Sequence, residues 1–534
     1  MAVTMKKLLT LVCLMALSQL PCHAQINWSS PPTTISTPGV NASDPQVVTD
    51  ISGNVTSVWV ENGVIQASTM SFGGSFGAIT SISNMAATSS SPRLGIDATG
   101  NAYAIWLENG VVSYSTLPAG GSWSAEIAIS NTGATEPTLA VDSFGNQAAI
   151  WTRNGFIESA QNPISVGTWG LVSQLSSNGT DDHPDIHIGE GGMILAIWHE
   201  LISGTQDSIF SARGSVNQPW ASPISVIAVT PGAHHNFPKV VVDQLGNATA
   251  VWFHYQVSGN AFSQVAAISS SLSSASSGWT PIPTQLSAGG LINPANLFLR
   301  LSIDANGNIV VVWVNSYDGL KYNVESSMLP QGGLWLIGGA PVLNNLYSFQ
   351  SDLSVTSFGQ AVIALMYYDG TDITIQSSDS GINGISFNFW SDFVNISQGT
   401  GNINPRVSAQ YSSANGAIYA GSVWVSNNGT NNVIQAASGI ETVIIPPSNV
   451  MITQGANNFG TFTEFFNTIT WTPSPDPNVF IYVLYRNGIA FVNVTADQSQ
   501  FVDHNAVQNQ AVTYGIAAIN SQNLLSPIAT GSFP

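Results

Sequence analysis

A five-residue motif with a tryptophan five positions after it decides the fold: Asp50-Ile51-Ser52-Gly53-Asn54 precedes Trp59, and Asp97-Ala98-Thr99-Gly100-Asn101 precedes Trp106. The same pattern returns at Asp142-Ser143-Phe144-Gly145-Asn146 with Trp151, at Asp243 with Trp252 and at Asp304 with Trp313. Each motif joins two apolar runs. Since Asp can bond back to the turn backbone and Gly accepts a positive φ, the motif predicts a hairpin turn. Calcium binding would need more carboxylates at close spacing.

Internal repetition extends beyond these five copies. Three degenerate units run from Gly189 to Trp198, from Thr356 to Leu365 and from Gln410 to Trp424. Each unit of about 45–60 residues continues through a second hairpin into a third strand, and an aromatic residue is expected to open a fourth. These aromatic residues are Phe76, Trp123, Trp169, Trp220, Trp279, Trp335 and Trp390. Four antiparallel strands per unit predict an all-β, eight-bladed β-propeller, or a seven-bladed one if a degenerate unit is misread.

The two ends of the repeat region complement each other. The eighth unit lacks a fourth-strand aromatic residue after Val433-Ile434-Gln435-Ala436, whereas the segment after residue 25 begins with Ile26-Asn27-Trp28-Ser29-Ser30-Pro31, which matches Trp220-Ala221-Ser222-Pro223. We therefore expect the N-terminal strand to complete the last blade over residues 25–444. Closure of the ring would remove its open sheet edges.

A different pattern follows Pro446-Pro447. Asn467-Thr468-Ile469-Thr470-Trp471, the apolar run 479–485 and Tyr514-Gly515-Ile516-Ala517-Ala518-Ile519-Asn520 resemble a fibronectin type III domain, with Trp471 at its second-strand tryptophan and Tyr514 at its sixth-strand tyrosine. The resemblance implies a small β-sandwich over residues 445–534 and no catalysis. The repeats are similar to those of exported bacterial propeller proteins and, more loosely, to sialidase-type and lectin propellers. They lack the Ser-x-Asp-x-Gly-x-x-Trp box of sialidases.

The first 24 residues have the pattern of a secretory signal peptide. Lys6 and Lys7 precede a short apolar run, and Cys22-His23-Ala24 ends it, which predicts cleavage after Ala24. Both cysteines lie in this segment. We expect a secreted, periplasmic or cell-surface protein, with no membrane insertion after cleavage.

The charge of the chain excludes some partners. Removal of residues 1–24 leaves eight basic residues against 29 acidic ones. Nucleic acid is excluded as a partner, because binding to phosphate backbones depends on clusters of Lys and Arg. No cofactor is predicted, and the sequence does not specify an oligomeric state.

A polar position recurs on the first strand of every unit, directly before an apolar one. It is occupied by Gln46, Arg93, Thr138, Asp185, Lys239, Arg300, Asp352 and Arg406. Half of the basic residues after position 24 thus fall in one ring. One interpretation is an anion-binding mouth with Arg93, Arg300 and Arg406 as forks for an oxyanion. The other is an internal ion-pair network, in which Asp185 and Asp352 neutralise their neighbours.

Histidines are concentrated in the fourth and fifth units. By the repeat alignment His183, His199, His234, His235 and His254 map to the face that carries the ring, with Asp181, Asp182 and Glu200 nearby. Imidazole and carboxylate are suitable zinc ligands. No ligand spacing is diagnostic, so the sequence predicts no metal and keeps His199, Glu200, His235 and His254 as candidate ligand contacts.

Three functions fit these observations. The first is a non-enzymatic exported protein that binds a glycan or protein at the propeller mouth. The second is a carbohydrate-active hydrolase or lyase that uses the same face, with Asp185 or Glu200 required for turnover. The third is a structural envelope component. No catalytic residue is assigned.

Overall fold

The computed structural model describes residues 25–203, 206–226, 233–258, 260–271, 278–280, 282–287, 290–291, 298–315, 322–336, 340–346, 350–357, 359–381, 390–520, 525–526 and 528–533. The predicted signal segment, residues 1–24, lies outside these ranges. Within them the secondary structure is β-strand without helix, which confirms the all-β prediction. Accordingly, no helix that could cross a membrane is found among these residues.

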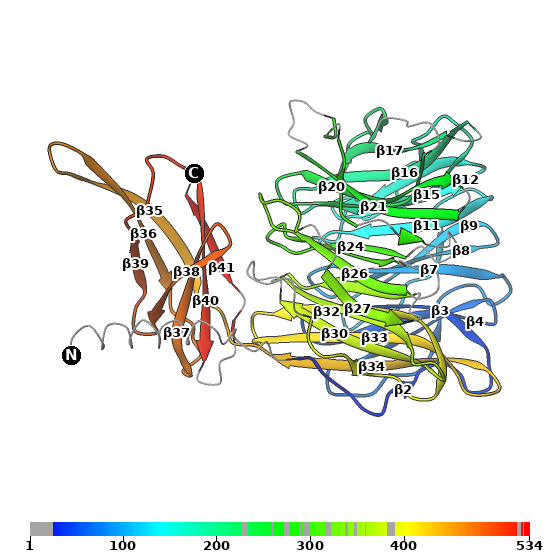
Figure 1. Cartoon of the computed structure of the whole chain (residues 1–534). Helices are drawn as coiled ribbons and strands as arrows, with labels where there is room; N and C mark the ends of the chain where they lie inside the picture. The colour runs from blue at the N-terminus through cyan, green and yellow to red at the C-terminus, as the bar shows by residue number, and fades with distance from the viewer. Residues whose placement is uncertain are drawn as a thin grey trace.

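Small antiparallel sheets follow one another along the chain in a propeller-like arrangement (Figure 1). The first three sheets comprise β3 (Ala42–Thr49), β4 (Val55–Glu61), β5 (Val64–Met70) and β6 (Thr80–Ser81); β7 (Ser89–Ile96), β8 (Ala102–Glu108), β9 (Val111–Leu117) and β10 (Ile127–Ala128); and β11 (Ala134–Val141), β12 (Gln147–Arg153), β13 (Phe156–Asn162) and β14 (Ser173–Gln174).

The next two sheets contain longer hairpins. They comprise β15 (Asp181–Ile188), β16 (Met193–Ser203), β17 (Gln206–Ser215) and β18 (Ile224–Ser225); and β19 (Ala233–Val242), β20 (Asn247–Ser258), β21 (Asn260–Ser271) and β22 (Thr284–Gln285), with β23 (Gly290–Leu291) also paired to β21.

Two further four-stranded sheets precede the last one. They comprise β24 (Leu299–Ile303), β25 (Ile309–Asn315), β26 (Tyr322–Leu329) and β27 (Ala340–Leu346); and β28 (Ser351–Val355), β29 (Gln360–Tyr368), β30 (Ile373–Gly381) and β31 (Val394–Asn395).

The last sheet of the repeat region combines the two ends of that region. It contains β32 (Thr400–Ser412), β33 (Ala417–Asn427) and β34 (Asn432–Thr442), and β34 pairs with both β1 (Asn27–Trp28) and β2 (Thr33–Thr34). Trp28 lies opposite Gly439. The first strands of successive sheets contact one another along the series, and β32 contacts β3.

The Asp-x-x-Gly-Asn turns form as expected. Asp97 Oδ1 accepts hydrogen bonds from the backbone amides of Thr99 and Asn101 at 2.9 and 3.0 Å, and Gly100 has φ of 87°. The motifs that begin at Asp50, Asp142, Asp243 and Asp304 make the equivalent bonds. These aspartates are therefore turn formers, and their carboxylates are engaged within the turn.

The repeat tryptophans form the cores between the sheets. Trp59, Trp106, Trp151, Trp198, Trp252, Trp313 and Trp424 are all 0% exposed. The second aromatic residue of each unit precedes the fourth strand instead of opening it, because that strand has only two residues in most sheets. Trp123, for example, comes before β10, which begins at Ile127.

A separate pair of sheets follows the repeat region (Figure 1). One contains β35 (Ser448–Asn458), β36 (Thr463–Thr472) and β39 (Gln500–Asp503); the other contains β37 (Val479–Arg486), β38 (Ile489–Thr495), β40 (Val512–Asn520) and β41 (Ala529–Phe533). Trp471 of β36 and Tyr514 of β40 belong to one buried cluster drawn from both sheets. Tyr514 donates its hydroxyl to Asp503 Oδ2 at 2.7 Å.

A buried carboxyl between the last two sheets of the repeat region makes stability depend on pH. Glu441 is 3% exposed and accepts a hydrogen bond from Gln360 Nε2 at 2.6 Å. Burial raises its pKa from 4.5 to about 9. The folded chain therefore keeps this proton while the unfolded chain releases it, so the free energy of unfolding falls as pH rises from 4.5 towards 9.

Replacement of Glu441 by glutamine removes the group whose deprotonation lowers the free energy of unfolding at high pH. We expect Glu441→Gln to unfold like the wild type near pH 4.5 and to be more stable at pH 8, by about 1 kcal/mol or more. Urea unfolding at the two pH values measures the difference. Equal pH dependence of the two proteins would contradict the assignment.

Candidate functional site

One cavity gathers the polar ring of the repeat region. Its volume is about 440 Å³, and its lining includes all eight ring residues: Gln46, Arg93, Thr138, Asp185, Lys239, Arg300, Asp352 and Arg406. Each comes from the first strand of a different sheet. The register read from the sequence thus converges on a single place in the structure.

A backbone irregularity positions most of these side chains. In six of the sheets a proline precedes the ring residue, and the residue before that proline has a positive φ near 50°; these residues are Asp44, Ser91, Glu136, His183, Phe237 and Asn404. The strand pairing shifts by a bulge that ends at the ring residue, as between Ser90 and Arg93. Bulges re-aim side chains, so this device turns the ring residue towards the cavity. The recurring X-Pro pair was the signal available in the sequence.

Two of the four cations in the cavity are neutralised. Lys239 Nζ lies 3.0 Å from Asp185 Oδ1, and Arg300 Nε lies 2.8 Å from Asp352 Oδ1. The second oxygen of Asp185 accepts the amide of Val240, and that of Asp352 accepts the amide of Val407, each at 3.0 Å. For these four residues the ion-pair interpretation holds, and Arg300 is not a free fork.

Arg93 and Arg406 are not neutralised in this way. Their Nη1 atoms donate to the carbonyls of the preceding Pro92 and Pro405 at 2.9 and 2.8 Å, and within the described residues neither guanidinium has a carboxylate at ion-pair distance. Burial, and after it the charge of Arg300, lowers the pKa of Arg93, and burial lowers the pKa of Arg406 to about 10. A guanidinium keeps its proton in proteins at neutral pH, so both side chains are cationic.

The cavity is lined by charges of both signs, and the charges of Asp44 and Glu136 also act on Arg93. Four cations face two carboxylates. His187 also lines the cavity, and burial lowers its pKa to about 4, so it is neutral at pH 7. Since β3 contacts both β32 and β7, Arg406 and Arg93 flank Gln46 along the ring. Such an arrangement suits the binding of an oxyanion.

The other candidate residues lie outside the cavity. His199, Glu200, His235 and His254 are absent from its lining. They lie away from it near the starts of β15 and β19, with Glu200 opposite Asp181 and His254 opposite His235. Glu200 Oε1 accepts from Asn178, and His235 accepts the indole N–H of Trp252 at 3.1 Å. His254 Nδ1 lies 3.2 Å from His235 Nδ1.

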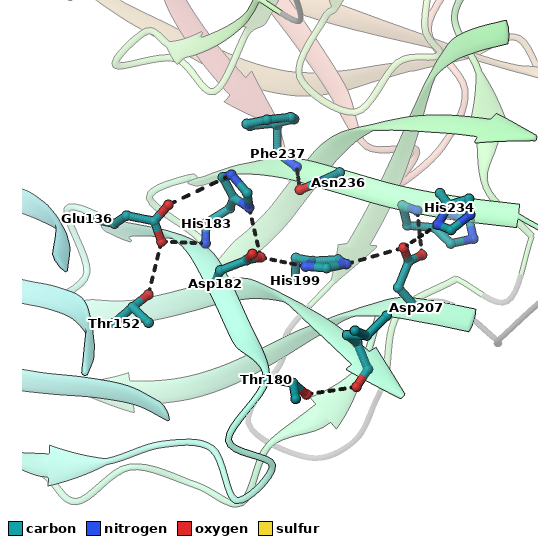
Figure 2. A network of polar contacts seen from close by, with 12 residues as sticks. Glu136, Thr152, Thr180, Asp182, His183, His199, Asp207, His234, Asn236 and Phe237 are labelled. Atoms are coloured by element: carbon teal, nitrogen blue, oxygen red, sulfur yellow. Dashed lines mark hydrogen bonds and ion pairs between the residues drawn. The ribbon is translucent and has the colours of Figure 1, made fainter. Parts of the chain in front are cut away.

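A chain of alternating carboxylates and imidazoles runs from Glu136 of β11 through His183 to His234 of β19 and so links three sheets (Figure 2). Asp182 Oδ1 lies 2.8 Å from His183 Nδ1 and 2.5 Å from His199 Nδ1. On the far side of His199, its Nε2 lies 3.3 Å from Asp207 Oδ2, which also lies 2.9 Å from His234 Nδ1. Sequence reasoning missed Asp207, which belongs to no repeated motif.

The pKa values of this cluster follow its contacts. Burial opposes charge on His199, but hydrogen bonds to Asp182 and Asp207 raise its pKa to about 9. Burial disfavours the charge of Asp207 as well, yet bonds from His199 and His234 lower its pKa. Burial lowers the pKa of His235 to about 4, so that histidine is neutral.

Glutamates beside the repeat tryptophans serve the core. Glu61 and Glu108 accept the indole N–H groups of Trp59 and Trp106 at 3.1 and 3.3 Å, and Glu158 and Glu325 do the same for Trp151 and Trp313. These carboxylates therefore accept hydrogen bonds from buried indole donors.

Comparison with known proteins identifies no family. No family model matches the chain, and no curated protein matches it. Among solved structures, a lectin from Burkholderia pseudomallei is 15% identical, with 67% of this chain and 98% of that chain covered and a TM-score of 0.42. An ulvan lyase is 11% identical, with 76% of this chain and 95% of that chain covered and a TM-score of 0.40. A fungal alcohol oxidase in complex with copper is 12% identical, with 95% of this chain and 99% of that chain covered and a TM-score of 0.42.

Proposed function

We propose that this chain is an exported binding protein whose cavity holds an anionic group of a glycan. Its repeat region forms an eight-bladed propeller closed by the N-terminal strand, and residues 445–534 form a fibronectin type III-like domain that acts as a spacer. The contacts from β3 round to β32, and the pairing of β1 and β2 with β34, support closure. The order β35-β36-β39 and β38-β37-β40-β41 supports the sandwich.

Export is proposed on the sequence of residues 1–24. The basic start, short apolar run and terminal Ala24 have the pattern of a cleaved signal. A protein without cysteines after position 24 must rely on packing rather than disulfides outside the cell. We infer that the protein is secreted or retained in the periplasm or at the cell surface.

The observation that carries the binding proposal is the pair of guanidiniums that have no carboxylate at ion-pair distance within the described residues, with Asp44 the nearby acidic group that acts on both. Holding Arg93 and Arg406 half-buried costs desolvation energy, and both pKa values are lowered by it. An internal network built for neutrality alone would pair every cation, as Asp185 and Asp352 do for Lys239 and Arg300. A bound carboxylate or sulfate supplies the missing partners in bidentate geometry.

The cavity favours a sugar acid over a protein surface. A volume of about 440 Å³ admits one or two small rings and lies within the usual range for small-ligand pockets. Gln46, Thr138 and the paired Asp185 and Asp352 offer hydrogen-bond donors and acceptors to hydroxyl groups beside the anion. We therefore propose a glycan that contains uronic acid or sulfated residues.

A glycan array tests this proposal. Residues 25–534 are expected to bind uronic-acid or sulfated glycans and to leave neutral glycans of the same backbone unbound. The same array is probed with a variant in which Arg93, Arg300 and Arg406 are alanine, after circular dichroism has shown that the variant is folded. Binding of neutral glycans, or retained binding by the variant, would contradict the proposal. Depolymerisation of a bound glycan would instead favour a carbohydrate-active enzyme.

A further inference from the structure

We propose that Asp182, His183 and His199 form a binding site for a divalent transition metal, for which Zn²⁺ is the probe. This site is separate from the cavity and does not depend on its proposed role. One oxygen or nitrogen from each residue lies within 4.8 Å of the others. The three residues come from adjacent positions of a paired hairpin, since Asp182 lies opposite His199 across β15 and β16.

The atoms that face one another are metal ligands. Nδ1 of both imidazoles converges on Oδ1 of Asp182, at 2.8 Å from His183 and 2.5 Å from His199 (Figure 2). Two imidazoles and one carboxylate suit zinc and its neighbours in the first transition row, whereas calcium and magnesium prefer oxygen ligands alone.

The second ring nitrogen of each histidine also faces a carboxylate. His199 Nε2 lies 3.3 Å from Asp207 Oδ2, and His183 Nε2 lies 3.8 Å from Glu136 Oε1. Histidines that bind metals usually donate this second N–H to a carboxylate or carbonyl, which fixes the tautomer. Asp207 and Glu136 come from β17 and β11, so neighbouring elements provide this outer support.

The surrounding carboxylates are compatible with a bound cation at this place. A neutral imidazole carries one N–H, so it can donate to Asp182 or to its outer carboxylate, but not to both. Coordination through Nδ1 lets each neutral imidazole keep Nε2–H for the outer carboxylate. Without a metal, His199 contacts both Asp182 and Asp207 by carrying a proton on each ring nitrogen, and an ion bound at Nδ1 would displace one of these protons. The three carboxylates of Asp182, Asp207 and Glu136 add negative charge that a divalent ion compensates.

The site is accessible to an ion from solution. The side chains of Asp182, His183 and His199 are 41%, 27% and 9% exposed. The Asp182 side chain is thus partly exposed to solvent, while the buried His199 contacts Asp207 through Nε2. Three protein ligands with an open side leave room for water in the remaining coordination positions.

Metal analysis of residues 25–534 tests the site. After treatment with a chelator, the protein is titrated with Zn²⁺ by calorimetry, and the bound metal is counted after dialysis. We expect one Zn²⁺ per chain and a higher melting temperature with zinc, whereas Ca²⁺ has neither effect. X-ray absorption at the zinc edge is expected to show imidazole scattering together with oxygen.

Variants separate this site from adventitious binding. Asp182→Asn and His183→Asn are expected to abolish stoichiometric binding; asparagine tolerates the positive φ of position 183. Asp207→Asn, which removes only outer support, should weaken binding by about 10- to 100-fold. His504→Gln is the matched control, because His504 also faces a carboxylate, Glu464, at 3.1 Å but lies outside the site. Absence of binding by the folded wild type, or binding unchanged by Asp182→Asn and His183→Asn, would overturn the proposal.

Discussion

Replacement of Arg93 and Arg406 together by glutamine is expected to weaken binding of the acidic glycan by at least about 100-fold, because hydrogen bonds to charged groups contribute roughly 1.5–3 kcal/mol each. Glutamine keeps much of the side-chain volume but neither the charge nor the fork. The fold should survive, since each guanidinium donates only to the carbonyl of its preceding proline among the described contacts. Calorimetric titration with the best glycan from the array measures the loss.

Two matched variants assign this effect to the cavity. Arg93→Lys keeps the charge but loses the planar fork, so its affinity should lie between those of the wild type and Arg93→Gln. Arg213→Gln makes the same change of charge in β17, outside the cavity lining, and should bind like the wild type. If the double glutamine variant is folded and binds with unchanged affinity, the ring is a structural charge network.

Removal of residues 25–36 from the predicted mature chain is expected to destabilise the repeat region by about 4 kcal/mol or more, because each buried Ile side chain contributes roughly 1.5–3 kcal/mol and the contacts of the partly buried Trp28 are lost as well. Ile26 and Ile35 are 2% and 5% exposed, and Trp28 packs in the same cluster as Ile26. The deletion also exposes the edge of β34, to which β1 and β2 are paired. Thermal unfolding and size-exclusion chromatography measure lower stability and self-association.

A complementation control keeps this prediction testable even if the truncated chain does not fold alone. A synthetic peptide of residues 25–36, added during refolding, is expected to restore the transition, and a peptide with Ile26→Ala and Trp28→Ala is not. A Cβ at Gly439 would clash with Ile26 Cγ2 and lie 3.1 Å from the Trp28 indole, so Gly439→Ala disturbs the same contacts while the segment stays in the chain. An unchanged melting temperature after truncation would contradict a closing role for this segment.

Much of the architecture is accessible from the sequence because the repeats expose it. Asp97 recurs in the motif because its carboxylate accepts a backbone amide of the turn, and Gly100 recurs because the turn needs a positive φ there. The polar ring is accessible for the same reason, since one register recurs on eight first strands and brings Arg93 and Arg406 to one cavity. Residues that are far apart in the sequence but share a position in the repeat therefore occupy equivalent places in the fold.

The rest depends on departures from the repeat. Asp207 lies at the start of β17, where no repeated motif assigns it a role, yet its carboxylate lies between His199 and His234. The bulge that ends at Asp185 shifts the pairing so that Asp182 meets His199, and this shift cannot be derived from alternation along the strand. The repeats therefore indicate that these histidines lie near the starts of β15 and β19, whereas the contacts that join them into one cluster depend on these departures.

The most direct test of the anion-binding cavity is a crystal structure of residues 25–534 soaked with selenate, a sulfate analogue whose selenium is located by anomalous scattering. We expect a selenium peak in the cavity, with selenate oxygens within hydrogen-bond distance of the guanidiniums of Arg93 and Arg406, while the Lys239–Asp185 and Arg300–Asp352 pairs stay intact. The peak should disappear in the double glutamine variant. A cavity that holds only water, with selenate bound elsewhere or not at all, would contradict the central claim.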